Sequence, residues 1–304
     1  MEQAPSRAFT THTQGGESAV SKGHTIMAEP GVRSLDESLR KKRDACVSIL
    51  RELGSVVVAF SGGTDSSLLL ALAVEALGRE NVLAAMAVST IFPQSERRAG
   101  VEFARRLGAK LLQLETPHLA DPKFTANPAD RCYYCKTRLL KRLLELAEKR
   151  NLKAVVTGSN ISDTGDYRPG LQAEKEHHIR QPLLEAKLSK DEIRRISKAM
   201  GLPGWDHPSK ACLASRIPYG QEINEETLSR IEKSEEFLGS LGFRQYRVRD
   251  HGQTARIELL PEDLSAAVER REEIVTALKG VGYAYVTLDL QGFRTGSMNE
   301  TLPK

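Results

Sequence analysis

The feature that most constrains this chain is an apolar run followed directly by a glycine-containing loop and a second apolar run. Residues 56–60 read VVVAF, which is typical of a strand buried on both faces of a parallel sheet. The loop 61–66 reads SGGTDS, and a helical apolar pattern follows over 67–77. Glycines let backbone N–H groups approach phosphate oxygens, and a helix N-terminus adds partial positive charge. The sequence therefore predicts an anion site whose hydroxyl donors are Ser61, Ser66 and Ser67.

The order of residues in the loop separates it from other phosphate-binding motifs. It lacks the Gly-Lys-Ser/Thr of a P-loop and the G-x-G-x-x-G of a dinucleotide fold. It resembles the signature of the PP-loop ATP pyrophosphatases, which release pyrophosphate and leave AMP on the activated substrate. That resemblance implies ATP bound by Gly62, Gly63 and the three serines, with Asp65 organising magnesium-bound pyrophosphate. The alternative is an ordinary glycine-containing turn with a polar helix cap.

Strands and helices alternate along the following hundred residues. The patterns predict strands over 82–88, 110–114 and 154–157, separated by helices over 94–107 and 136–150. Strands separated by helices predict a doubly wound parallel sheet, so the expected fold class is α/β. A capping box, Ser189-x-x-Glu192, then begins another helix that ends near Gly201.

The regular alternation of strands and helices ends near residue 220. Residues 201–220 are rich in Gly, Pro and small polar residues, which is typical of a connector that carries a functional loop. Beyond it the patterns predict helices over 224–241 and 261–280 and strands over 245–249, 254–259 and 283–290. We therefore expect a disordered extension (1–33), a PP-loop ATP pyrophosphatase domain (34–220) and a smaller C-terminal α+β domain (221–304) for substrate binding or oligomerisation.

The composition argues against several classes of protein. No segment approaches the roughly 20 apolar residues that a membrane-spanning helix needs, and the polar N-terminal residues lack the apolar centre of a signal peptide. We therefore expect no membrane association and a cytoplasmic location. Lys and Arg number 44 against 40 Asp and Glu, and a net charge of +4 is too small to make nucleic acid the expected partner.

Three of the four cysteines have the spacing or setting of metal ligands. Cys132 and Cys135 lie three positions apart at the start of a predicted helix, and Cys212 lies in the loop PSKACLASRIPYG. If their thiolates converge, they suit either zinc with a fourth ligand or an iron–sulfur cluster with one open iron. The alternatives are a structural zinc knuckle or ordinary packed thiols. The cationic neighbours expected to lower the pKa of these thiols are Lys136, Lys210 and Arg216.

Two groups of residues are candidates for binding an anionic substrate. Arg247 and Arg249 lie two positions apart on a predicted strand, so both guanidiniums share one face, and Arg216 beside Ser215 is a third candidate. A solvated strand face would show the same alternation. Ligands bind open α/β sheets at the carboxyl ends of strands. Contacts to nucleotide or substrate are therefore expected after residue 157, from Asp163, Asp166 and Arg168.

The motifs taken together resemble the LarE family, the ATP-dependent sulfur insertases that build the nickel-pincer nucleotide cofactor. The likeness runs from about residue 35 to 301. The motifs, in chain order, are SGGTDSSLL, DRCYYCK, TGSN at 157–160, GDYRPG at 165–170, WDHPSKACLASRIPYG and YRVRDH at 246–251.

This resemblance implies a reaction. ATP adenylates each carboxylate of pyridinium-3,5-biscarboxylic acid mononucleotide, and sulfur then displaces AMP to form a thiocarboxylate. The resemblance assigns catalysis to Asp65, Cys212 and Arg216 and adds Gly158 to the nucleotide site. The implied substrate contacts are Ser215, Arg216, Arg247, Arg249, Asp166 and Arg168. The family also tends to self-associate, so a homo-oligomer is expected.

The number of cysteines bears on where the sulfur comes from. Some members of the family have one cysteine, at the position of Cys212, which gives up its own sulfur and becomes dehydroalanine. The additional Cys132 and Cys135 favour a [4Fe-4S] cluster on all three thiolates that carries exogenous sulfide. The sacrificial route remains an alternative, as do a tRNA-thiolating PP-loop enzyme and a non-catalytic sensor of nucleotide or metal.

Overall fold

The computed structural model describes residues 29–163, 169–208 and 211–300. Asp166, Arg168 and Lys210, which the sequence singled out, lie outside the described residues. Among the described residues, none of the helices combines the length and the apolar character needed to cross a membrane.

The first sheet is parallel, as predicted, which confirms the α/β fold class. Its strands run in the spatial order β3-β2-β1-β4, so that β1 lies at the centre of the sheet and Val56 faces both Val82 and Ala154. Both neighbours of β1 are parallel strands, which explains its continuous apolar sequence. The strands are β1 (Val56–Ala59), β2 (Val82–Val88), β3 (Lys110–Glu115) and β4 (Ala154–Val156).

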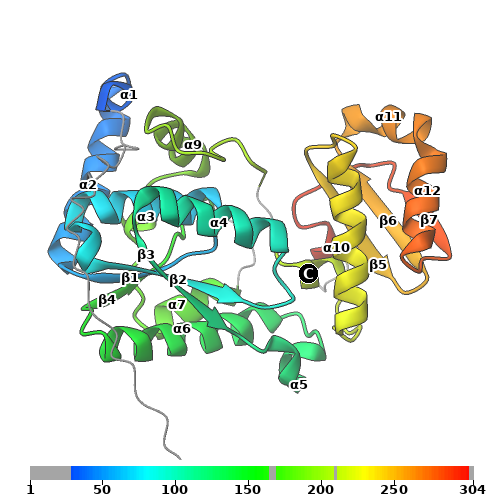
Figure 1. The fold of residues 1–304 in the computed structure, drawn as a ribbon, viewed down its shortest axis with the longest axis horizontal. Helices are drawn as coiled ribbons and strands as arrows, with labels where there is room; N and C mark the ends of the chain where they lie inside the picture. The colour runs from blue at the N-terminus through cyan, green and yellow to red at the C-terminus, as the bar shows by residue number, and fades with distance from the viewer. Residues whose placement is uncertain (1–28, 164–168, 209–210, 301–304) are drawn as a thin grey trace, which may run out of the picture.

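Helices cover both faces of this sheet (Figure 1). Val56 and Val58 pack into a core shared with α2, α3, α4 and α9, whereas Val57 packs on the opposite face with α6 and α7. Two-sided burial of alternate residues is what a doubly wound sheet requires. These helices are α2 (Glu37–Leu53), α3 (Thr64–Leu77), α4 (Gln94–Leu107), α6 (Arg131–Lys149), α7 (Pro169–Glu176) and α9 (Lys190–Ala199), with short helices α5 (Pro122–Thr125) and α8 (Pro182–Glu185) between them.

The second sheet has three strands and its own apolar core. In the order β5-β6-β7, β5 pairs antiparallel with β6, and β6 pairs parallel with β7. The helix predicted over 261–280 is in fact two helices, because a 3-10 turn begins it and the chain leaves helical geometry at Arg270. The elements are α10 (Glu225–Ser240), β5 (Tyr246–His251), β6 (Thr254–Leu259), α11 (Leu264–Glu269), α12 (Arg271–Gly280) and β7 (Tyr285–Leu288).

One part of the predicted disordered extension is helical. Helix α1 (Glu29–Arg33) lies against α9, and Val32 packs onto the main core. An ideal Cβ on Gly31 would come within 2.0 Å of the Ala199 carbonyl oxygen, so glycine permits this close approach. The sequence prediction of disorder is therefore wrong for residues 29–33, while residues 1–28 lie outside the described residues. The domain boundary at residue 220 stays a prediction.

Candidate functional site

The glycine-containing loop joins the end of β1 to the start of α3. Gly62 has a φ of +83°, and a Cβ there would lie 3.1 Å from the Cα of Gly100, so both backbone conformation and packing favour glycine. The Ser66 hydroxyl donates to the Gly63 carbonyl at 3.0 Å, and the Ser67 hydroxyl donates to that of Gly62 at 3.4 Å. These two hydroxyls, expected as phosphate donors, hold the shape of the loop itself.

Backbone N–H groups in the first turn of α3 are the remaining candidate donors to an anion at this loop. The N-cap of α3 is Gly63, which has no side chain to accept from the first turn. Gly158, just beyond β4, lies so close to this turn that a Cβ would come within 3.0 Å of the Ser66 nitrogen. The structure thus brings Gly158 to the predicted nucleotide site, from a strand almost a hundred positions away.

Asp65, in the first turn of α3, is paired with a cation that the sequence analysis did not identify. Lys190 Nζ lies 2.6 and 2.7 Å from the two Asp65 carboxylate oxygens. Burial raises the pKa of Asp65, while the Lys190 charge acts in the opposite direction. Lys190 begins α9, and a cation in the first turn of a helix is unfavourable because of the helix dipole. This unusual position was the signal in the sequence that Lys190 pairs with a carboxylate.

A cavity of about 590 Å³ lies between the carboxyl end of the parallel sheet and the second sheet. Asp65 of α3 and Asp163 of the 3-10 turn after β4 line it, and so do Arg247 and Arg249 of β5. Positive side chains outnumber negative ones in its lining, as a site for phosphates and carboxylates requires. The cationic lining residues are Arg131, Lys136, Lys190, Arg247, Arg249 and Arg294, and the acidic ones are Asp65, Asp163 and Glu174.

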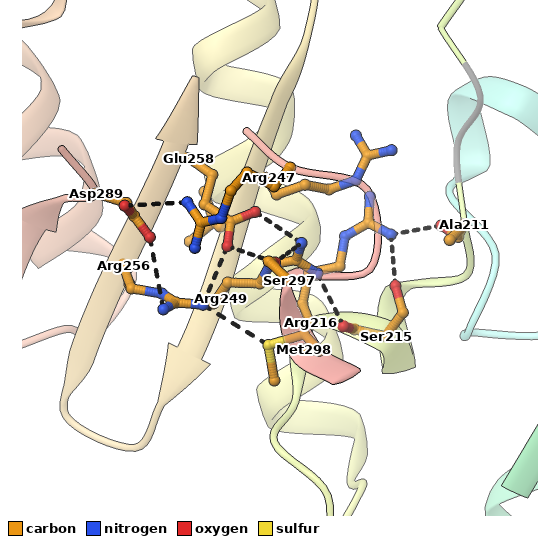
Figure 2. Close-up of polar contacts among 12 residues, drawn as sticks. Ala211, Ser215, Arg216, Arg247, Arg249, Arg256, Glu258, Asp289, Ser297 and Met298 are labelled. Atoms are coloured by element: carbon orange, nitrogen blue, oxygen red, sulfur yellow. Dashed lines mark hydrogen bonds and ion pairs between the residues drawn. The ribbon is translucent and has the colours of Figure 1, made fainter. Parts of the chain in front are cut away.

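Arg247 and Arg249 both line this cavity, as their spacing predicted. Figure 2 shows the polar contacts around these side chains. The Arg249 guanidinium is held by Ser215 O at 3.0 Å, by Glu258 Oε2 at 2.7 Å and by Ser297 Oγ at 2.9 Å. Burial and then the nearby Arg216 charge lower the pKa of Arg247 to about 10. A bound anion would offset this burial of positive charge.

Arg216 occupies a different place from the one predicted. Its side chain is fully buried and is not among the described residues that line the cavity. Its guanidinium makes a two-point ion pair with Glu235 at 2.8 and 2.7 Å and donates to the Cys212 carbonyl oxygen. It also donates to the carbonyl oxygen of Ala211 (Figure 2). Because its guanidinium pairs with Glu235, Arg216 points toward α10 and away from the cavity. From there it holds the backbone of the loop that carries Cys212.

This geometry predicts a large stability effect for Arg216→Met. Burial of Glu235 acts to raise its pKa, but the charge and hydrogen bonds of Arg216 act more strongly in the opposite direction. The pKa of Glu235 is therefore lowered. Without Arg216, the burial that raises this pKa would be opposed only by the Arg247 charge and the Val248 N–H, and we expect a loss of about 3–5 kcal/mol in unfolding free energy near neutral pH. A group with a raised folded pKa loses its stabilising effect as the pH rises, so the deficit should shrink as the pH falls toward 4.5, the ordinary Glu pKa.

Urea unfolding at several pH values measures this effect. The control is Arg244→Met, which breaks the exposed pair with Asp206 and should cost less than about 1 kcal/mol. Equal losses in the two variants, or a deficit for Arg216→Met that does not depend on pH, would contradict the assignment.

The three candidate metal-binding cysteines come from two regions that the fold brings near each other. Cys135 and Cys212 pack against the same apolar cluster, which includes Ile91 and Phe124. Ionisation of Cys212 would raise the pKa of both Cys132 and Cys135, so all three thiols lie within electrostatic range. Cys132 lines the cavity. In the described part of the chain, however, no three His, Cys, Asp or Glu side chains are close enough together to hold a metal ion.

The expected lowering of the thiol pKa by neighbouring cations is wrong for two cysteines. Burial raises the pKa of Cys132, and it raises that of Cys135 to about 12. Lys136 acts in the predicted direction, but its ammonium group is paired with the buried Glu174 at 2.6 Å, and desolvation of the thiols outweighs its effect.

Comparisons with known proteins agree with this arrangement. The NAD synthase family model matches residues 41–127, which contain the loop and the first three strands. The chain is 41% identical to an uncharacterized protein of Synechocystis over 88% of this chain and 100% of that protein. It is 37% identical to the pyridinium-3,5-bisthiocarboxylic acid mononucleotide synthase of Lactiplantibacillus plantarum, over 88% of this chain and 97% of that enzyme.

The similarity therefore extends well beyond the phosphate loop. A short match to the loop region alone would leave the second sheet and the cysteine-bearing loops without a counterpart. The longer alignments span both sheets, in agreement with the motifs read from the sequence. This chain belongs to the LarE family, within the PP-loop enzymes.

Proposed function

We propose that this chain is an ATP-dependent sulfurtransferase that converts the carboxylates of pyridinium-3,5-biscarboxylic acid mononucleotide to thiocarboxylates. The observation that carries the proposal is a single cavity lined by Asp65 of the anion loop, by Cys132 and by the Arg247–Arg249 pair. A nucleotide, the Cys132 thiol and the cationic groups for a dicarboxylate would thus share one space. The printed name of the Lactiplantibacillus plantarum relative supports this substrate.

The first step is adenylation. A carboxylate oxygen attacks the α-phosphorus of ATP, the bond to the β-phosphate oxygen breaks, and pyrophosphate leaves. Negative charge on the leaving pyrophosphate is offset by the amides of the loop, by Lys190 and by Mg²⁺, for which Asp65 is the proposed ligand. Arg247 and Arg249 would hold the substrate's anionic groups while its carboxylate reacts.

The second step is transfer of sulfur. A sulfur nucleophile attacks the acyl carbon of the adenylate, and AMP leaves with the electrons of the broken C–O bond. The thiolates of Cys132, Cys135 and Cys212 are soft ligands that would hold a [4Fe-4S] cluster, and the chemistry this cluster would supply is delivery of exogenous sulfide. Arg216 holds the Cys212 backbone in place. In the alternative mechanism Cys212 provides its own sulfur.

A reconstituted reaction tests the proposal. Anaerobic enzyme is incubated with Mg-ATP, sulfide and either the pyridinium dicarboxylate mononucleotide or tRNA, and pyrophosphate and thiocarboxylate are measured. We expect both products with the mononucleotide only. No pyrophosphate with that substrate would refute the proposal, and thiolated tRNA would replace it. Sulfide as donor, a homo-oligomeric state and a cytoplasmic location remain predictions.

Substitution of Arg247 should weaken binding of the substrate more than binding of ATP. Arg247→Met removes one charge-assisted contact, which is worth about 1.5–3 kcal/mol, so KM for the mononucleotide should rise by about 10- to 150-fold. KM for ATP should change little. Steady-state kinetics with Arg244→Met as the matched loss of an exposed arginine measure this, and an equal rise in both KM values would contradict the role.

A further inference from the structure

Arg131, the first residue of α6, is a buried arginine of the cavity wall to which the proposed chemistry gives no role. Only 3% of it is exposed, yet it lines the cavity. Its guanidinium donates through Nη1 to the side-chain oxygen of Asn127 and lies over the Tyr219 ring, 5.2 Å from the ring centroid. Both partners are neutral. Among the described residues, no carboxylate pairs with Arg131, and its Nε has no hydrogen-bond partner.

Four other cations that line the cavity have carboxylate partners within 3.0 Å, so their charges are balanced inside the protein. The pairs are Lys136–Glu174, Lys190–Asp65, Arg249–Glu258 and Arg294–Glu300. Burial of an arginine without such a partner is unfavourable, because the guanidinium loses hydration and gains no opposite charge. A ligand anion beside Arg131 would supply that charge.

The Arg131 guanidinium is held in place by a fully buried asparagine. Asn127, which accepts from Arg131, also donates through Nδ2 to two carbonyl oxygens of the loop that closes this side of the cavity. They belong to Ile217 and Pro218, at 3.3 and 2.7 Å. The Asn127 carbonyl oxygen accepts from the Gly220 N–H at 2.9 Å. The arginine is thus fixed before any ligand arrives, which reduces the entropy that binding must overcome.

Arg131 lies where sulfur transfer would take place. Cys132 is the next residue and also lines the cavity. Burial and then the Cys212 charge raise the pKa of the Cys132 thiol, whereas the charge and a hydrogen bond of Arg131 act to lower it, so the guanidinium lies beside that sulfur. Arg247 and Arg249 line the same cavity from β5. One substrate molecule could therefore meet cations of α6 and of β5 together.

The proposed substrate carries an anionic group that suits Arg131. It has two carboxylates on one pyridinium ring and a phosphate on the ribose. In each round one carboxylate is adenylated and meets the sulfur donor, while the other group keeps its negative charge. Because both groups are on the same ring, the non-reacting one must lie near the reacting one, whereas the phosphate lies beyond the ribose. A guanidinium binds a carboxylate through two parallel N–H donors.

We propose that Arg131 binds the carboxylate that is not reacting, and that it thereby selects a pyridinium dicarboxylate over a monocarboxylate. Arg247 and Arg249 would then hold the phosphate. The inference rests on the proposed function and adds to it the residue that recognises the second carboxylate. It concerns binding, so it can be tested without ATP and without sulfur transfer.

Calorimetric titration of the full-length chain measures affinity for two ligands, the pyridinium dicarboxylate mononucleotide and its analogue that lacks one carboxylate. The parent should bind the dicarboxylate about 10- to 150-fold more tightly, the effect of one charge-assisted contact. Arg131→Gln should weaken dicarboxylate binding by a similar factor and leave monocarboxylate binding within a few-fold, because the lost contact exists for one ligand only.

Two further variants complete the test. Arg131→Lys keeps the positive charge and replaces the glutamine variant if that variant does not fold. It should weaken dicarboxylate binding by a smaller factor, because an ammonium group lacks the two-point fork, and leave monocarboxylate binding unchanged. Arg138→Met is the matched control, since it removes a partly exposed arginine of the same helix that pairs with Asp121, and both affinities should match the parent.

The comparison of the two ligands decides the assignment. An equal effect on both in a folded Arg131 variant, including no effect on either, would overturn it, because Arg131 would then contact the shared phosphate or act only on the fold. Equal affinity of the parent for both ligands would overturn it as well. A parent chain that binds neither mononucleotide would refute the proposed function itself, so the two failures are distinguishable.

Discussion

Asp65→Asn is expected to reduce release of pyrophosphate by about 10²- to 10³-fold, the usual effect of removing one preorganised charge-stabilising group. The carboxylate lies in the first turn of α3 beside the anion loop and lines the cavity. Asparagine keeps the shape of the side chain but cannot provide the negative charge that binds Mg²⁺. The loss should therefore be greatest at low Mg²⁺ and partly recovered at high Mg²⁺.

The fold should tolerate this change. The Asp65–Lys190 pair keeps 27% and 23% of the two side chains accessible, so its loss should cost less than loss of the buried Arg216–Glu235 pair. Asp36→Asn is the matched control, because it removes a carboxylate from the exposed pair with Arg195, outside the cavity lining. Rapid-quench assays of pyrophosphate at several Mg²⁺ concentrations measure the effect. Parent rates for Asp65→Asn, or a loss that Mg²⁺ does not alter, would contradict the role of Asp65.

Cys212→Ala is expected to abolish formation of thiocarboxylate while substrate-dependent release of pyrophosphate continues. Adenylation uses the anion loop and the cavity cations, whereas sulfur delivery needs the Cys212 thiol in both mechanisms considered. The Cys212 loop should keep its shape, because Arg216 binds the backbone carbonyl of residue 212 at 3.0 Å and not its sulfur. Pyrophosphate and thiocarboxylate are assayed separately, the latter by mass spectrometry, to show that adenylation continues while sulfur transfer is lost.

Cys46→Ala is the control for loss of a thiol. Cys46 lies on α2 and is buried in the main core, so it should be dispensable for the reaction. Thiocarboxylate at the parent rate from Cys212→Ala would exclude both mechanisms. The parent protein distinguishes between them after turnover: an intact Cys212 supports a cluster that carries sulfide, and conversion of Cys212 to dehydroalanine supports the sacrificial route.

The local sequence was sufficient to predict most helices and strands and the anion loop. Helix α4 and strands β2 and β6 have the predicted bounds, because apolar periodicity reflects which faces are buried. The capping box of α9 is present as well, since it needs only residues within one turn. Arg247 and Arg249 share a face because alternate residues of a strand must do so.

Contacts between distant segments could not be predicted from the local pattern of residues. Lys190 meets Asp65 across 125 positions, and Arg216 turns away from the cavity because Glu235 on α10 accepts its guanidinium. His118 meets Ser89 because β3 lies beside β2 in the sheet, and the packing of α6 brings Cys135 to the same imidazole ring. Periodicity specifies which side of an element is buried, but the partner of a buried charge depends on how loops close and helices pack. For this reason the sequence was enough to predict the chemistry of the loop, while the pairing of its charged and sulfur-containing side chains came from the tertiary fold.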